Sequence, residues 1–225
     1  EDLSARSSKL AKEISELQAL SNEMFDPELA QEINAEIERE NAPDPGKGDA
    51  ESIFTLFAAD RLYRNTRTGS FAGLPNVTWN GLMDDDKTPK FLFEPSSQNP
   101  FRFIRHGGQV IQPRLMDTDG GSIPRILHGS ARFDPWHYAL GYIIHDWIFI
   151  AQKCGHAPDD GISFEDSATI LAECIKTQME VGFTDVDGST VKFPKKEDTM
   201  YLIYKAVSSS FARRIWNDHS TAVCR

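Results

Sequence analysis

The chain has 225 residues, of which 34 are acidic and 24 basic, and its net charge of −10 gives an isoelectric point near 5.1. This charge argues against a general nucleic-acid-binding protein, which needs a basic face for phosphates, and against electrostatic docking on anionic lipid. A hydrophobic fraction of 40% is enough for a buried core, but no apolar run reaches the roughly 20 residues that a membrane-spanning helix needs.

The first 40 residues have the periodicity of amphipathic helices. Apolar side chains recur every seven residues, at Leu3, Leu10, Leu17 and Met24. Such a stripe cannot bury itself, so this arm either packs on its own domain or forms an interface for a partner protein or for self-association. The next stretch, NAPDPGKGD, has the composition of a linker. We therefore predict a helical arm at 1–40, a linker at 41–49 and one domain at 50–225.

The chain from residue 50 to 116 has the pattern of short β-strands. Apolar or alternating runs, among them SIFTLF, NVTW, KFLFEP and FRFIR, are separated by glycine, proline, asparagine and aspartate. The stretch FRFIRHGGQVIQPRL predicts a hairpin in which Gly107 and Gly108 form the turn and His106 lies at the surface. We expect a small antiparallel sheet here.

From residue 135 onward the patterns are helical. We predict one helix over about 135–153 with Gly155 as its C-cap, and a second over about 163–181 with Ser163 as its N-cap. A third, amphipathic helix is predicted over about 197–216. The expected fold class is α+β, with a small antiparallel sheet followed by three packed helices and the helical N-terminal arm.

Three cysteines, Cys154, Cys174 and Cys224, leave one without a partner and lack the spacing of a metal site. Free or buried thiols are the simplest interpretation. For an exported protein, a bridge between Cys154 and Cys174 is the alternative. Because the chain starts at Glu1, a removed leader stays open as well.

Two ionisable residues stand inside the most apolar predicted helix, in the stretch IIHDWIFI. His145 and Asp146 are neighbours on that helix and point about 100° apart, so each needs a partner from another element. A buried carboxylate without a partner costs on the order of several kcal/mol or takes up a proton. This pair is therefore the first candidate for a functional site.

Two neighbouring stretches offer partners to the pair. The loop DTDGGSIPR supplies Asp119, Ser122 and Arg125, and its Gly-Gly step permits a tight path close to the core. The following helix supplies Asp166 in its first turn and Glu173 two turns later. A carboxylate from either position would orient the imidazole and stabilise its charged form.

The order of these motifs resembles domain-of-unknown-function family 1353, which occurs in bacteria and phages. The likeness rests on TDGGSIPR, a helix carrying HDW, SFEDSA at a helix start and MYLIYKAV before a tryptophan, over roughly residues 100–217. The matching positions are Thr118, Asp119, Ser122, Pro124, Arg125, His145, Asp146 and Asp166. The resemblance implies a bacterial or phage-related protein, either cytoplasmic or exported as an effector, and brings no assigned activity.

The predicted helices also resemble the histidine-aspartate helix pair of secreted phospholipases A2. By that likeness His145 is the general base that activates a water, Asp166 orients it, and Asp146 with the Asp119 loop holds a cation or the oxyanion. The chain departs from that family because no cysteine precedes the histidine. In a variant of this hypothesis Ser122 is the nucleophile, although no nucleophile elbow surrounds it.

Three functions therefore follow from the sequence. The first is a phospholipase-like hydrolase of ester bonds, and the second is a divalent-metal hydrolase of cell-wall or phosphodiester bonds. In the third, the same residues only clasp loop to helix in a phage-derived structural, immunity or delivery module. The candidate catalytic residues are His145, Asp166, Ser122 and Arg125, and the candidate ligands for Ca²⁺ or Zn²⁺ are Asp146 and Asp119. Either enzyme would fit a lipid or cell-wall substrate.

Overall fold

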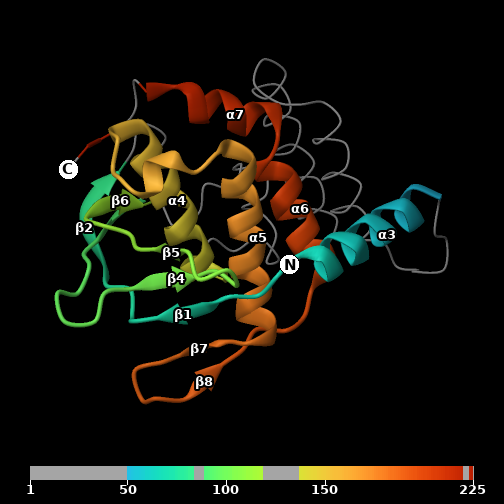
Figure 1. Ribbon diagram of the computed structural model, residues 1–225, viewed down its shortest axis with the longest axis horizontal. Helices are drawn as coiled ribbons and strands as arrows, with labels where there is room; N and C mark the ends of the chain where they lie inside the picture. Colours follow the sequence, from blue (N-terminus) through green and yellow to red (C-terminus); the bar gives the residue numbers. More distant parts are fainter. Residues whose placement is uncertain (1–49, 84–88, 119–136, 220–222, 225) are drawn as a thin grey trace, which may run out of the picture.

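The computed structural model describes residues 50–83, 89–118, 137–219 and 223–224 (Figure 1). Within these ranges the protein is α+β, with five helices and small antiparallel sheets, which confirms the expected fold class. The predicted arm and linker at 1–49 lie outside the described residues, and so do positions 119–136, which hold most of the predicted loop.

Short strands form three antiparallel sheets in the described part of the chain. The first sheet has the order β1 (Ser70–Ala72), β4 (Arg102–Ile104), β5 (Val110–Ile111), and the second has the order β2 (Val77–Met83), β3 (Pro89–Phe93), β6 (Met116–Thr118). The third sheet pairs β7 (Phe183–Thr184) with β8 (Thr190–Val191). The predicted hairpin is the β4–β5 pair, with His106 exposed at its turn and Gly108 at a φ of +86°.

The stretch SIFTLF at 52–57 is helical, so the strand expected there was wrong. These residues belong to α3 (Ala50–Asn65), which contains neither glycine nor proline. The buried residues of this helix include Ala59 and Tyr63, which are four positions apart and therefore lie on one face. That face packs against α6 (Glu197–Val207), and this packing overrides the β propensity of the apolar run.

The predicted helices after residue 135 are confirmed, with one change. They are α4 (Ala139–Cys154), which ends at Gly155 with a φ of 66°, and α5 (Phe164–Glu180), which Ser163 caps by accepting the Asp166 N–H at 3.1 Å. A short 3₁₀ turn, η3 (Asp159–Gly161), lies between them. The predicted last helix is divided into α6 and α7 (Ser210–Asn217), because Ser209 starts a new helix by accepting the Ala212 N–H.

The core has two parts, and α4 and α5 contribute to both. One cluster joins α3, α5 and α6 and includes Tyr63, Ile175 and Ile203. The other surrounds α4 and includes the strand residue Phe103, Trp147 of α4, and Trp216 of α7, whose ring contacts that of Phe149. In Figure 1 the strands of the first two sheets lie on one side of α5 and α3 and α6 lie on the other.

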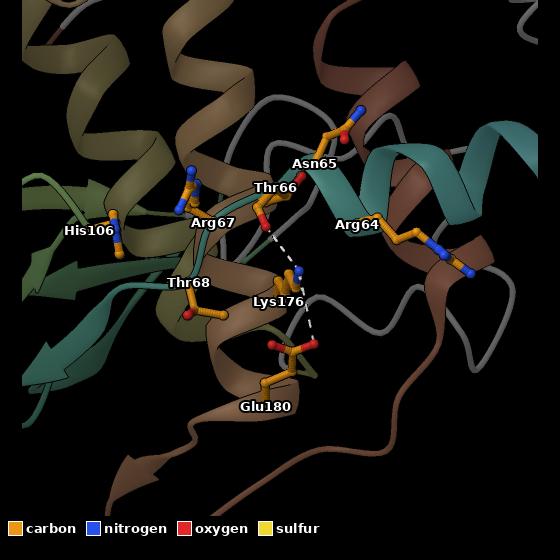
Figure 2. A pocket seen from close by; sticks show the side chains of 8 residues that line it. All are labelled: Arg64, Asn65, Thr66, Arg67, Thr68, His106, Lys176 and Glu180. Carbon is orange, nitrogen blue, oxygen red and sulfur yellow. Dashed lines mark hydrogen bonds and ion pairs between the residues drawn. The ribbon is translucent and has the colours of Figure 1, made fainter.

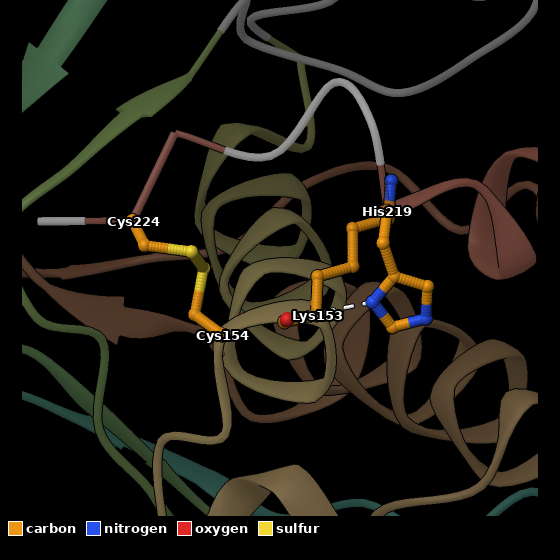
Figure 3. The surroundings of a disulfide bond; sticks show 4 residues. All are labelled: Lys153, Cys154, His219 and Cys224. Atoms are coloured by element: carbon orange, nitrogen blue, oxygen red, sulfur yellow. Dashed lines mark hydrogen bonds between the residues drawn. A yellow bond between two sulfur atoms is a disulfide. The ribbon is translucent and has the colours of Figure 1, made fainter.

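A disulfide joins Cys154, the last residue of α4, to Cys224, with 5.6 Å between the two Cα atoms (Figure 3). This corrects both the expectation of free thiols and the Cys154–Cys174 alternative. Cys174 lies on α5 inside the core, and burial raises the pKa of its thiol. The chain after α7 instead returns to the end of α4, where His219 Nδ1 lies 3.4 Å from the Lys153 carbonyl oxygen. Cysteine spacing contains no information about this return.

Replacing both bridged cysteines, as Cys154→Ser with Cys224→Ser, should lower the free energy of unfolding by about 4 kcal/mol. The disulfide closes a loop between positions 70 residues apart, and the cost follows from the chain entropy that the cross-link removes from the unfolded state. Urea unfolding with and without a dithiol reductant measures it. The Cys174→Ala variant, as the control, should stay as sensitive to the reductant as the parent. If the reductant leaves the free energy of unfolding of the parent protein unchanged, the disulfide is contradicted.

Candidate functional site

His145 is enclosed by apolar groups in the interior of α4. The residue is 1% exposed, and the centroid of its ring lies 4.8 Å from the centroid of the Phe149 ring. Neither ring nitrogen has a hydrogen-bond partner among the described residues. Burial lowers the pKa of His145 to about 4, because an apolar environment disfavours the charged imidazolium. The side chain is therefore neutral at pH 7 and has one nitrogen able to accept a proton.

A cavity of about 30 Å³ adjoins His145. Its other walls come from three helices and consist of Phe149, Ala206, Val207, Phe211, Ala212 and Ile215. A space of this size holds roughly one water molecule, but a stably bound water needs at least two polar partners. Among the described residues, His145 is the only polar side chain in this wall, so the cavity suits a methyl or methylene group better than a permanent water.

Asp146 has a separate environment, as the helix geometry predicts. It is 7% exposed, and one of its carboxylate oxygens accepts a hydrogen bond of 2.6 Å from the Thr118 hydroxyl at the end of β6. This bond joins the second sheet to α4. The loop that follows Thr118 carries Asp119, Ser122 and Arg125, which lie outside the described residues, so their roles stay predictions.

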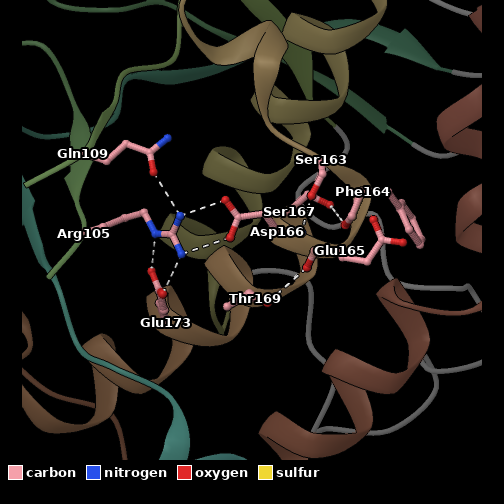
Figure 4. A network of polar contacts seen from close by, with 9 residues as sticks. All are labelled: Arg105, Gln109, Ser163, Phe164, Glu165, Asp166, Ser167, Thr169 and Glu173. Carbon is pink, nitrogen blue, oxygen red and sulfur yellow. Dashed lines mark hydrogen bonds and ion pairs between the residues drawn. The ribbon is translucent and has the colours of Figure 1, made fainter. Parts of the chain in front are cut away.

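Asp166 does not pair with His145, so the orienting role predicted for it is not observed. Its two carboxylate oxygens accept hydrogen bonds from Arg105 of the β4–β5 hairpin, at 2.9 and 3.1 Å (Figure 4). Glu173 was the other carboxylate predicted to orient the imidazole. It also binds Arg105, through two hydrogen bonds of 2.8 Å. Both α5 carboxylates therefore neutralise one guanidinium and leave His145 unpaired.

Arg105 uses its whole hydrogen-bonding capacity in this network. A fifth hydrogen bond, of 3.0 Å, goes to the side-chain oxygen of Gln109, so each of the five guanidinium N–H groups has an acceptor. The bonds to Glu173 are the largest cause of a raised Arg105 pKa, so the guanidinium stays charged. No local pattern in the sequence points to Arg105, because its partners Asp166 and Glu173 follow 61 and 68 residues later.

The tryptophan of the HDW stretch has a structural role. Trp147 donates its indole N–H to a carboxylate oxygen of Asp159 in η3, at 2.7 Å. The His156 ring stacks on the Trp147 ring, with 5.5 Å between the two centroids. Burial is the main cause of a raised Asp159 pKa, against the lowering effect of the Trp147 hydrogen bond. Trp147 therefore fixes the connection between α4 and α5.

The candidate metal ligands do not converge in the part of the chain that the structure describes. There, no group of three or more histidine, cysteine or acidic side chains is arranged to hold a metal ion. Asp146 binds Thr118 and Asp166 binds Arg105, while Asp119 lies outside the described ranges. A Ca²⁺ or Zn²⁺ site built on Asp119 and Asp146 stays a prediction.

The Arg105→Met variant should lower the free energy of unfolding by on the order of 3 kcal/mol, because it leaves the buried Glu173 carboxylate and Asp166 without their cation. Chemical denaturation measures the loss. The control, Arg213→Met, removes an exposed ion pair with Glu165 and should cost less than about 1 kcal/mol. Equal losses in the two variants would contradict the importance given to the Arg105 network.

The unpaired His145 also predicts a pH dependence of stability. The unfolded chain takes up a proton near pH 6.5 and the folded protein only near pH 4, so the unfolded state binds more protons between these values. The free energy of unfolding should therefore fall, by on the order of 3 kcal/mol, as the pH drops through this window. The free energy of unfolding of the parent minus that of His145→Leu, measured at each pH, separates the effect of His145 from that of the carboxylates. A difference that does not change with pH would contradict the prediction.

Comparisons with known proteins did not identify a relative of this chain. No family model, curated protein or solved structure matches this chain. The resemblance to domain-of-unknown-function family 1353 therefore rests on the quoted motifs alone. No helix among the described residues is both long and apolar enough to cross a membrane.

Proposed function

We propose that the protein is a hydrolase of ester bonds in which the neutral imidazole of His145 accepts the proton of the attacking water. The observation that supports this function is the burial of both ring nitrogens without a hydrogen-bond partner in the described structure. Buried polar groups in cores are nearly always paired, and an unpaired one costs about 1–3 kcal/mol. Such a cost is typical of a group that is kept for a ligand or a reaction.

In the proposed reaction, the water oxygen attacks the ester carbonyl while His145 takes one of its protons. The imidazolium then gives that proton to the departing alkoxide, so water and ester become carboxylic acid and alcohol. The apolar cavity walls from α6 and α7 would hold one methyl or methylene group of the substrate, which favours an ester with an aliphatic chain. Asp166 has no part in this scheme because Arg105 binds it.

A base with so low a pKa needs help from its surroundings in the transition state. The imidazolium that forms there would lie in an apolar site, where a nearby carboxylate would stabilise it. Asp146 is adjacent in sequence but is bound by Thr118. We therefore assign this support, and the stabilisation of the oxyanion, to the predicted loop with Asp119, Ser122 and Arg125.

A second candidate function is a non-enzymatic phage-derived structural, immunity or delivery module. A different observation favours it, because the carboxylates of Asp146, Asp166 and Glu173 are all bound by groups of the protein itself. These contacts fix β6 to α4 and the β4–β5 hairpin to α5. In such a module His145 would only fill space in the core.

The His145→Leu variant separates the two candidates. If the protein is a hydrolase, this variant should lose activity while its stability at pH 7 stays equal or rises, since an unpaired polar group is replaced by an apolar one of similar size. The assay is hydrolysis of phospholipid vesicles and of murein, each with and without Ca²⁺ and Zn²⁺. His219→Gln, which changes an exposed histidine of the C-terminal tail, is the control and should keep full activity.

Two results would contradict the hydrolase. One is hydrolysis by His145→Leu at the rate of the parent, and the other is no cleavage of either substrate by the parent under any of these conditions. A loss of several kcal/mol of stability in His145→Leu would mean that the imidazole nitrogens are paired in solution. That outcome would remove the observation on which the hydrolase rests and favour the module.

A further inference from the structure

A groove runs between the end of α3, α5 and the turn of the β4–β5 hairpin. It consists of two hollows of about 410 and 370 Å³, and both are lined by Arg67 and His106. Figure 2 shows the first hollow, with His106 and Arg67 on one side and Lys176 and Glu180 of α5 below the end of α3. These volumes are in the range of small-molecule sites, and the groove shares no lining residue with the His145 cavity.

Arg67 is the cation of this groove that is available to a ligand. It is exposed and has neither a carboxylate nor another acceptor as a partner among the described residues, although acidic residues outnumber basic ones in this chain. Its neighbours differ. Arg64 extends away from the other lining side chains (Figure 2). It binds Asp60 at 2.7 Å, and Arg105 is fully occupied. An unpaired guanidinium beside a hollow suits an oxyanion, which it can bind through two parallel hydrogen bonds.

Lys176 adds a second positive charge beneath the end of α3. Its side chain is only 10% exposed, and its ammonium group donates to the carbonyl oxygens of Tyr63 and Thr66, at 2.6 and 2.9 Å. The carboxylate that partners it, Glu180, is 3.9 Å away and 44% exposed. The Glu180 carboxylate pairs with this ammonium, so Lys176 serves the groove mainly through its hydrogen bonds to the chain. The same bonds fix the chain next to Arg67.

The acidic groups of the groove limit what it can bind. Glu173 shares the single positive charge of Arg105 with Asp166, and Glu180 lies beside Lys176. These carboxylates would repel a ligand with several negative charges. A ligand with one anionic group and neighbouring hydroxyl or amino groups could donate hydrogen bonds to them. Gln109 uses its side-chain oxygen for Arg105, which leaves its amide nitrogen as a donor.

We propose that this groove binds a small polar molecule that bears one phosphate or carboxylate group, with the anion held by Arg67 and His106. Glycerol 3-phosphate and glycerate represent the two anion types, and both carry hydroxyl groups. The site is independent of the hydrolase function, so either proposal can fail without the other.

Isothermal titration of the full chain with glycerol 3-phosphate, glycerate and inorganic phosphate at low salt tests the proposal. We expect saturable binding of one equivalent of at least one organic anion, weakened about tenfold or more in Arg67→Gln. Arg61→Gln is the matched control, because Arg61 is also an exposed arginine of this region but lines neither hollow, and it should bind like the parent. Which anion binds more tightly identifies the group.

Two further variants distinguish a built site from general attraction of charge. Arg67→Lys keeps the charge but loses the planar fork, so it should bind more weakly than the parent, and His106→Asn should also reduce affinity. Equal weakening by Arg61→Gln and Arg67→Gln would mean diffuse attraction and would overturn the proposal. The absence of saturable binding by the parent up to roughly 10 mM of each anion would overturn it as well.

Discussion

The Arg105 guanidinium is the contact on which the arrangement of sheet and helices most depends. Strands of two or three residues, such as β4 and β5, are too short to be stable by themselves. Four hydrogen bonds of Arg105 hold their hairpin against α5 at two points of that helix, Asp166 and Glu173, and a fifth stays within the hairpin, at Gln109. Other polar side chains of α5 also hold neighbouring segments in place. Thr177 accepts a hydrogen bond from the N–H of Gly69, just before β1, and Lys176 donates to carbonyl groups at the end of α3. α5 thus supports both halves of the fold.

The histidine-aspartate pair of α4 is divided between two sides of that helix. Asp146 faces the second sheet and is satisfied by Thr118, whereas His145 faces α6 and α7 and borders an apolar cavity. Adjacent positions on a helix diverge by about 100°, so one polar pair reaches two different layers of the protein. The two residues therefore do different things. One joins elements, and the other is the unpaired group on which the proposed chemistry rests.

Local signals predicted the elements well, and long-range partners could not be predicted. The Ser163 cap, the Gly155 end and the glycine turn of the hairpin depend on neighbours within a few residues, and all three are observed. The run SIFTLF was assigned wrongly because its composition suits a strand, whereas it belongs to a helix whose Tyr63 lies in the core with α6. Arg105 and the Cys154–Cys224 bond depend on how distant segments meet, which no spacing in the chain encodes. The burial of His145 was predictable, but the loss of its expected carboxylates to Arg105 was not.

The disulfide has a topological consequence for the C-terminal third of the molecule. Everything between its two cysteines, from α5 through the β7–β8 hairpin to α7, lies within one covalently closed ring. The exposed turn of that hairpin carries Val186, which is 89% exposed and thus open to a protease. A cut there would open the backbone without releasing a fragment, because both pieces stay joined through Cys154 and Cys224. In an oxidising compartment such a nicked chain would keep all of its residues, and the two pieces would separate only after reduction and unfolding.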